Sequence, residues 1–332
     1  MPSAEPTTPS PLVFWSVAGG DLRRRLDTIA QLDAAGVDAV LLAHESLAAA
    51  DPILLAGAAS RRAPRIGLIV ALSPWLQPPF HTARALGTLD ALTRGRAGWL
   101  VDAGPAPFSS TDDTARWNAS GVTDPAELDR AAADYLTATA ALWNSWEPGA
   151  LIADVDAGQY VDPARVHVPH HRGEFFAVRG PLNMPRSPQG RPVIVARWPQ
   201  GATDPDAASA AADLLVVNVE ADVAAARLHA ATVLLELTGT AATAPPRTTA
   251  DGYLFSGIDD PALYGQVVHT VLPGLLPHRG RGGLLRERLG LPAPDFDWAD
   301  PTQTPATTAR ARTAPARTAP ARTASATTED PA

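Results

Sequence analysis

"RIGLIVAL", residues 65–72, is a short run of mostly branched apolar side chains with polar residues and proline on both sides. A strand whose two faces are both covered by protein shows such a continuous apolar run, whereas a strand with one face in water alternates apolar and polar residues. The stretch therefore predicts a buried strand in a parallel sheet that is covered on both faces.

Seven further stretches have the same character and also predict strands. They are "LVFWSVA" (12–18), "DAVLLAH" (38–44), "AGWLVDAG" (97–104), "PVIVARW" (192–198), "DLLVVNV" (213–219), "TVLLELT" (232–238) and "GYLFSG" (252–257). Alanine-rich and leucine-rich segments of helical period lie between most of them. Eight strands in alternation with helices predict an α/β fold of the (β/α)8 TIM type, a closed barrel. A doubly wound open sheet is the alternative, but no G-x-G-x-x-G follows the first strand.

Helix starts are indicated by four Asp-Pro pairs, at Asp51, Asp124, Asp204 and Asp260. An aspartate at the N-cap accepts hydrogen bonds from free amide groups, and proline at the first helical position loses no needed donor. One connection departs from the pattern. "GTAATAPPRTTAD" (239–251), between the seventh and eighth strands, is too short and too rich in proline for a full helix. One outer helix is therefore expected to be missing there.

The composition excludes several kinds of chemistry. The chain has no cysteine, and its 27 basic residues are all arginine. Disulfides, thiol catalysis, a P-loop lysine and a Schiff-base lysine are impossible. A net charge of −8 argues against nucleic acid as a partner. No apolar run is long enough to cross a membrane, and the first ten residues lack the features of a secretory signal, so we expect a soluble, cytoplasmic protein.

The chain divides into three parts by composition. Residues 1–10 are expected to be a flexible N-terminus, and residues 11–298 the barrel domain. Residues 299–332 contain no apolar residue larger than alanine and repeat "ARTAP". Such a segment cannot bury enough apolar surface to offset the entropy of ordering, so we expect a disordered tail.

Candidate functional residues follow the predicted strand ends, because ligands of such barrels bind at the carboxyl ends of the strands. These residues are Trp15, Ser16, His44, Glu45, Ser73, Asp102, Arg197, Trp198, Asn218, Glu220 and Ser256. His44 could act as acid, base or hydrogen-bond donor, or could only cap its strand. Asp102 interrupts an apolar strand and needs a partner there, which Arg197 or His44 could supply.

"HVPHH" (167–171) is a histidine cluster in a proline-bearing connection. Three histidines without a carboxylate on a regular element do not fix the geometry of a metal site. We therefore expect no metal there.

Four segments together resemble the luciferase-like flavin monooxygenases, in the branch of the nitrilotriacetate and dibenzothiophene-sulfone monooxygenases. They are "PPFHTARALGTLDALTRGRAGW" (78–99), "ALWNSW" (141–146), "HRGEFFAVRGPLNMPRSPQGRPVIV" (171–195) and "RGGLLRERLGLPAP" (281–294). The resemblance implies a (β/α)8 barrel with an inserted hairpin around "GEFFAVRG". It also implies reduced FMN from a separate flavin reductase, oxygenation of a small organic substrate by O2, and a homodimer.

The resemblance also assigns cofactor positions in this chain. Ser73 keeps the family's residue, and His44 stands where the family has an aspartate. The family's phosphate loop is replaced by residues 196–201, in which Arg197, Gln200 and Gly201 are the candidates for phosphate contact. Leu100 stands where the family has an asparagine and offers no hydrogen bond to the flavin ring, and Asp102 puts negative charge near that ring. Trp198 is large enough to fill part of the ring pocket.

Three hypotheses about function follow from these residues. The first is an FMN-dependent monooxygenase with His44 and Asp102 as catalytic residues. The second is a cofactor-poor paralogue that binds a metabolite or a partner protein without redox chemistry. The third is another reaction at the barrel mouth, with His44 as acid or base and Asp102 or Arg197 as its orienting group.

Overall fold

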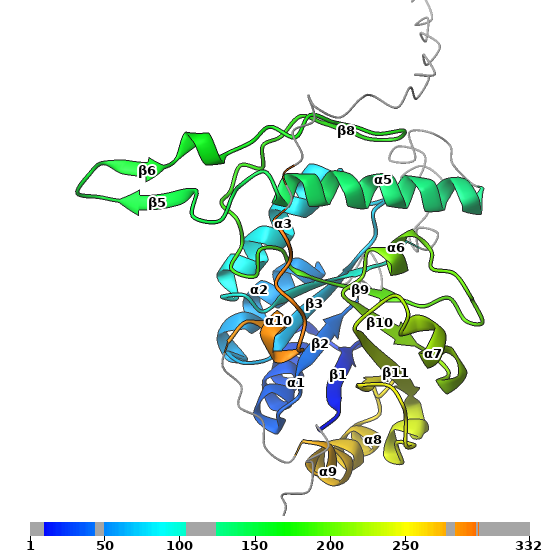
Figure 1. The fold of residues 1–332 in the computed structure, drawn as a ribbon. Helices are drawn as coiled ribbons and strands as arrows, with labels where there is room; N and C mark the ends of the chain where they lie inside the picture. The colour runs from blue at the N-terminus through cyan, green and yellow to red at the C-terminus, as the bar shows by residue number, and fades with distance from the viewer. Residues whose placement is uncertain (1–9, 44–49, 104–123, 277–282, 297, 299–332) are drawn as a thin grey trace, which may run out of the picture.

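The computed structural model describes residues 10–43, 50–103, 124–276, 283–296 and 298, and its centre is a closed barrel of eight parallel strands (Figure 1). Around the barrel the order is β1-β12-β11-β10-β9-β4-β3-β2. The strands are β1 (Leu12–Val17), β2 (Ala39–Leu42), β3 (Gly67–Leu72), β4 (Ala97–Val101), β9 (Val193–Arg197), β10 (Leu214–Val217), β11 (Thr232–Thr238) and β12 (Gly252–Ser256). Each of the eight predicted stretches contains one of these strands, so the predicted barrel is confirmed.

Successive side chains of each strand point alternately to the barrel axis and to the surrounding helices. On β1, Leu12 and Phe14 belong to the cluster that fills the axis, whereas Val13 and Trp15 belong to the outer cluster. Both sets are apolar and buried. This explains why the strands appear in the sequence as unbroken apolar runs.

The outer layer of the barrel consists of helices of very different length. Their bounds are α1 (Leu22–Ala35), α2 (Pro52–Arg62), α3 (Pro79–Leu92), α5 (Pro125–Trp143), α6 (Ala207–Ala210), α7 (Val223–Ala226), α8 (Pro261–Gln266) and α9 (Leu272–Leu275), with a π-helical turn at Val267–Val271 between the last two. Within the ranges that the structure describes, no helix is both long and apolar enough to span a membrane.

Three of the four predicted Asp-Pro starts are helix caps. The carboxylates of Asp51, Asp124 and Asp260 accept hydrogen bonds from amide groups in the first turns of α2, α5 and α8. The prediction for Asp204 is wrong, because α6 begins two residues later than expected. Its cap is Asp206, which accepts from the amide of Ser209 at 2.8 Å.

The connection from β11 to β12 contains one 3₁₀ segment, Gly239–Thr243, and no α-helix among its residues 239–251, all of which are described. The hydroxyl of Tyr253 on β12 donates to the carbonyl of Pro246 and so holds the proline-rich part of this connection against the barrel.

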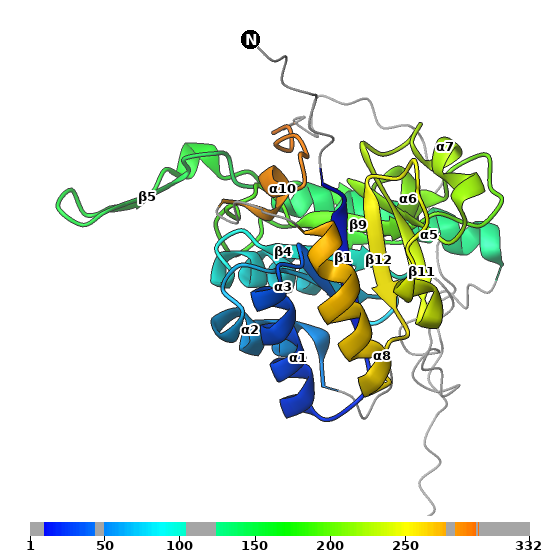
Figure 2. The same cartoon turned by 90° about the horizontal axis from the view of Figure 1, so that it is seen from below.

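Two antiparallel hairpins lie between α5 and β9. β7 (His171–Arg172) pairs with β8 (Ala177–Val178) at the "GEFFAVRG" segment. The second hairpin, which the sequence did not predict, pairs β5 (Leu151–Asp154) with β6 (Gln159–Val161). We call residues 151–161 the arm, because they project from the body of the molecule in both views (Figures 1 and 2).

The amino end of the barrel is closed by α10 (Leu285–Arg288). Leu285, Leu289 and Leu291 are buried and belong to the cluster that fills the barrel axis. Adding a Cβ at Gly67 would bring it within 2.7 Å of Leu285, so this glycine allows α10 its close approach to β3.

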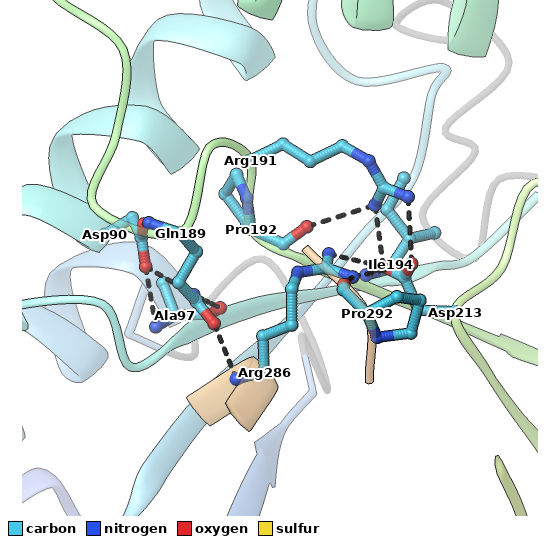
Figure 3. Close-up of polar contacts among 9 residues, drawn as sticks. All are labelled: Asp90, Ala97, Gln189, Arg191, Pro192, Ile194, Asp213, Arg286 and Pro292. Carbon is cyan, nitrogen blue, oxygen red and sulfur yellow. Dashed lines mark hydrogen bonds and ion pairs between the residues drawn. The ribbon is translucent and has the colours of Figure 1, made fainter. Parts of the chain in front are cut away.

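A buried polar network fastens this closure (Figure 3). Asp213 accepts two hydrogen bonds from Arg286 of α10, at 2.8 and 2.9 Å, and two from Arg191, at 2.6 and 2.8 Å. Gln189 connects the same region to Asp90 of α3, at 2.6 Å, and accepts from the amide of Arg286. Two of the segments that carry the family resemblance, 171–195 and 281–294, therefore meet at the base of the barrel.

Candidate active site at the barrel mouth

Polar side chains replace apolar ones where the inward-facing rows of several strands reach the carboxyl end. On β9 the row runs from Val195 to Arg197, and on β11 from Leu234 to Glu236. On β12 it ends at Ser256, whose hydroxyl lies 3.1 Å from that of Thr238 on β11. The mouth of the barrel is therefore the place where this chain assembles polar groups over an apolar floor.

Arg197 and Glu236 form the main charged contact of the described mouth. Nη1 of Arg197 donates to Oε2 of Glu236 in a short bond, and Nη2 donates to Oε1 at 3.3 Å. The Glu236 side chain is largely buried and that of Arg197 is half exposed. A two-point guanidinium–carboxylate pair of this kind has a fixed orientation.

The prediction that Arg197 could be the partner of Asp102 is wrong. Arg197 lies against Glu236 and not against Asp102, which follows β4 and is exposed. The amide of Asp102 donates to the carbonyl of Leu72, which fixes the end of β4 beside β3. The other predicted partner, His44, lies outside the described residues. So do residues 1–9 of the N-terminus predicted over 1–10, and the predicted tail 299–332.

The loop after β9 is fixed by a carboxylate that sequence reasoning missed. The amide of Gly201 donates to both oxygens of the buried Asp222, at 3.3 and 3.2 Å. Gly201 has a φ of +72°, which only glycine adopts readily. Gln200 beside it is exposed.

Trp198 does not fill a pocket at the mouth, contrary to the prediction. Its side chain belongs to the outer core and stacks on His229, with ring centroids 5.3 Å apart. The reason is strand alternation: because Arg197 faces the mouth, the next side chain faces the helices. The space over the axis next to Arg197 is therefore not taken by this ring.

Ser73, which the resemblance assigns to the flavin side, is buried directly after β3. Its hydroxyl accepts a hydrogen bond from the amide of Trp75 at 3.3 Å. The indole of Trp75 in turn donates to the carbonyl of Ala103, after β4. Ser73 thus stands at a point where the ends of β3 and β4 are held together.

The histidines of "HVPHH" have structural contacts away from the mouth. His167 lies 2.7 Å from Glu147 and stacks on Trp298, with ring centroids 4.5 Å apart. His171 lies 2.7 Å from Asp134 of α5, which also accepts from the amides of Phe175 and Phe176. Within the described ranges, no three acidic or histidine side chains are grouped so that they could hold a metal ion.

The predicted cofactor loop, residues 196–201, needs free groups that could bind the phosphate of FMN. Proteins bind phosphate through guanidinium groups and free backbone amides. Here the guanidinium of Arg197 already pairs with Glu236, and the amide of Gly201 already donates to Asp222. The loop therefore does not fit a phosphate in the arrangement described; it would do so only if a ligand displaced Arg197 from Glu236.

Comparison with known proteins assigns the family. A family model described as luciferase-like monooxygenase matches residues 6–268. One of the chains of pristinamycin IIA synthase from Streptomyces pristinaespiralis is 35% identical over 271 residues, which are 79% of this chain and 87% of the relative. The chain belongs to the luciferase-like family of flavin-dependent monooxygenases.

Other relatives match over shorter stretches. Dibenzothiophene-sulfone monooxygenase of Rhodococcus erythropolis is 43% identical over 133 residues, 39% of this chain and 28% of the relative. A second chain of the same pristinamycin IIA synthase is 30% identical over 150 residues, 44% of this chain and 29% of the relative. The chain thus matches less than a third of the length of these two proteins.

Solved structures support the fold. Long-chain alkane monooxygenase has a TM-score of 0.69 at 18% identity, over 86% of this chain and 96% of the other. The EDTA monooxygenase from Chelativorans sp. BNC1 has a TM-score of 0.64 at 20% identity, over 86% and 99%. At these identities the likeness concerns the barrel and its helices alone.

Proposed function

We propose that this chain is the oxygenating component of a two-component monooxygenase, which takes FMN reduced by a separate reductase and oxygenates a small organic molecule with O2. The observation that carries the proposal is the family match over residues 6–268, together with 35% identity to a relative of which the chain covers 87%. Reduced FMN would supply the two electrons with which one oxygen atom enters the substrate and the other becomes water.

The mouth residues have distinct roles in this proposal. Arg197, once displaced from Glu236, and the neighbouring Gln200 and Gly201 would face the phosphate side of the cofactor, and Ser73 would contribute a hydroxyl on the ring side. Asp102, exposed at the end of β4, and His44 exchange protons or hydrogen bonds with the substrate. Glu236 orients Arg197 in the free protein, and the cofactor phosphate would have to take the place of this carboxylate.

Assembly with a second luciferase-like chain is part of the proposal. Two chains of the Streptomyces pristinaespiralis synthase resemble this chain, one of them over most of its length. A synthase built from two chains of one family supports a comparable assembly here.

The exchange at Arg197 can be tested by titrating the purified chain with FMN, oxidised and chemically reduced under anaerobic conditions. Glu236→Gln removes the competing charge without changing the size of the side chain, so it should tighten binding of reduced FMN by about tenfold, which corresponds to about 1.4 kcal/mol. Arg197→Gln should weaken it by at least as much.

Glu287→Gln is the matched control, because Glu287 lies on α10 at the opposite end of the barrel and accepts from the amide of Leu284. It should leave FMN affinity unchanged. If no variant binds FMN in either redox state at hundreds of micromolar, the monooxygenase proposal is wrong and the cofactor-poor paralogue replaces it. If FMN binds but Glu236→Gln has no effect on its affinity, the replacement of Glu236 by phosphate at Arg197 is refuted, while the monooxygenase proposal is not.

A further inference from the structure

A second cavity lies at the amino end of the barrel, at the opposite end from the mouth. Its volume is about 780 Å³, and its walls come from the last turns of α2, the turn after α3 and the two residues before α10. The charged side chains among its described lining residues are all arginine: Arg61, Arg94 and Arg96. In a chain whose net charge is −8, a cavity with this lining is a local concentration of positive charge, which attracts anions.

Arg96 has a structural role at this cavity. Its side chain is buried, and its guanidinium donates to the carbonyls of Ser60, Ala63, Ile66 and Thr93, at 2.6 to 3.2 Å. Three of these carbonyls lie at the carboxyl ends of α2 and α3, where the helix dipole places partial negative charge. Arg96 therefore satisfies the two helix ends, and any other arginine here adds charge that the helix ends do not need.

Arg61 and Arg94 supply this additional charge. Both are exposed, and within the ranges that the structure describes neither guanidinium has a hydrogen-bond or ion-pair partner. Arg62, the next residue after Arg61, differs, because it pairs with Asp27 at 3.0 Å. The two free guanidinium groups thus remain available to a ligand in the cavity.

The pKa of Arg96 shows that positive charges are crowded here. Burial is the largest cause that lowers this pKa, and the charge of Arg288 lowers it further. Asp33 raises it and Arg94 lowers it again, and Asp33 also pairs with Arg65 at 3.2 Å. A bound anion would supply negative charge that this part of the molecule has too little of.

The backbone at Arg94 gives a second reason to expect a ligand. Its φ is +57°, in the left-handed region that glycine adopts most readily at the end of a helix. Packing and hydrogen bonding of the turn therefore favour glycine at this position. A ligand that binds the guanidinium would explain why arginine occupies it.

The cavity is larger than a simple inorganic anion needs, and part of its lining is apolar. Leu92, at the end of α3, is 66% exposed, and Pro64 and Leu284 also line the cavity. A guanidinium group forms paired hydrogen bonds with phosphate oxygens, so two arginines from different elements can hold one phosphate group from two sides. The lining therefore suits a ligand with a phosphate group and an apolar organic part.

We infer that this cavity binds a small phosphate ester, with the phosphate group between Arg61 and Arg94 and the organic part against Leu92. The amide of Leu285 donates to the carbonyl of Gly95 at 2.8 Å, so the ligand lies beside the point where α10 joins the turn after α3. The inference goes beyond the proposed function and does not rest on it, because the mouth lies at the other end of the barrel.

Phenyl phosphate is the probe for this site, titrated calorimetrically into the full-length protein in a phosphate-free buffer of constant ionic strength. Arg61→Gln and Arg94→Gln should each weaken its binding by about tenfold or more, since each removes a charge-assisted contact. Arg172→Gln is the matched control, because Arg172 is an exposed arginine on β7 and does not line the cavity. It should leave the affinity unchanged.

Arg94→Gly separates binding from folding. It removes the guanidinium and suits the left-handed backbone, so the urea midpoint should not fall, while binding of phenyl phosphate should weaken as much as in Arg94→Gln. Phenyl phosphate should raise the urea midpoint of the natural chain, because it binds the folded state, and should not raise that of Arg94→Gly.

Three results would overturn the inference: no saturable binding at millimolar phenyl phosphate, an equal loss of binding in Arg172→Gln, or a loss in Arg197→Gln at the mouth with none in Arg61→Gln. Inorganic phosphate should bind more weakly than phenyl phosphate, and equal affinities would contradict the contact with Leu92. FMN affinity, measured on the same Arg61 and Arg94 variants, should not change. Failure of this inference therefore leaves the monooxygenase proposal intact.

Discussion

Asp213 shows how a single, largely buried carboxylate can hold distant parts of the chain together. It lies between Arg191, from the loop before β9, and Arg286, from α10, and also accepts from the amide of Ile194. Burial alone would raise the pKa of this carboxyl, but hydrogen bonds from Arg286 and the charge of Arg191 outweigh burial and bring the pKa below its ordinary value. The carboxylate form is therefore the one that the folded chain stabilises.

Asp213→Asn should destabilise the protein by about 3 kcal/mol near neutral pH, because it leaves the buried Arg286 without its carboxylate. Since the folded pKa is depressed, this stability is present above the unfolded pKa of about 4 and is lost as the pH falls through the folded pKa. Urea unfolding at pH 7, 4 and 3 measures both effects.

The unfolding free energy of the variant should be well below that of the natural chain at pH 7, and the two values should approach each other in acid. Asp154→Asn on the exposed arm serves as the control and should follow the natural chain throughout. An equal loss for Asp213→Asn at pH 7 and pH 3 would contradict the assigned role of the charge.

At the scale of elements, α10 is a helix of four residues whose position matters more than its length. Its Leu285 packs on the barrel axis where Gly67 leaves room, 2.7 Å from the place of a Cβ. Helix propensity does not predict the packing of Leu285 on the barrel axis or its approach to Gly67. So short a helix is stabilised by its packing on the barrel and not by its own hydrogen bonds.

Leu285→Ala should cost about 2–5 kcal/mol of unfolding free energy by leaving a cavity, and Gly67→Ala about 1–3 kcal/mol by overpacking. Because the added methyl group occupies part of the space that the leucine vacates, the double variant should be more stable than the sum of the two losses predicts. Urea unfolding of the four proteins gives this coupling. Strict additivity would mean that α10 does not pack on Gly67 in solution.

At the scale of the whole molecule, the barrel could be predicted because all eight strands are buried on both faces and so appear as unbroken apolar runs. The contacts across the mouth could not, because they depend on which strands become neighbours and in which register. Glu236 interrupts "TVLLELT" as Asp102 interrupts its own predicted stretch, so the same reasoning could have found it. Strand alternation could likewise have placed Trp198 outside once Arg197 was taken to face inward.

The position of Asp206 and the arm illustrate two other limits. Asp204 and Asp206 are equally good caps by residue type, and only the backbone path decides between them. The arm has too few residues per strand for a reliable alternation signal. Neither the cap of α6 nor the arm could be predicted, because the residues around each do not favour one backbone path over another.

Removing residues 299–332 should leave the urea midpoint unchanged, because that segment contains no apolar residue larger than alanine. Trp298→Ala in the full chain should lower stability by about 1 kcal/mol, since it removes the ring stacked on His167. A midpoint that falls on truncation would show that the tail contributes to the fold, contrary to its composition.

The closed base of the barrel has a consequence for the order in which molecules come and go. The apolar side chains that fill the barrel axis, with α10 packed beneath them, leave no path through the barrel, so a ligand over the axis exchanges on the mouth side. Where two ligands lie one above the other, the deeper one must enter first and leave last. The two ligands therefore bind and dissociate in a fixed order, so an excess of the upper ligand should slow release of the lower one.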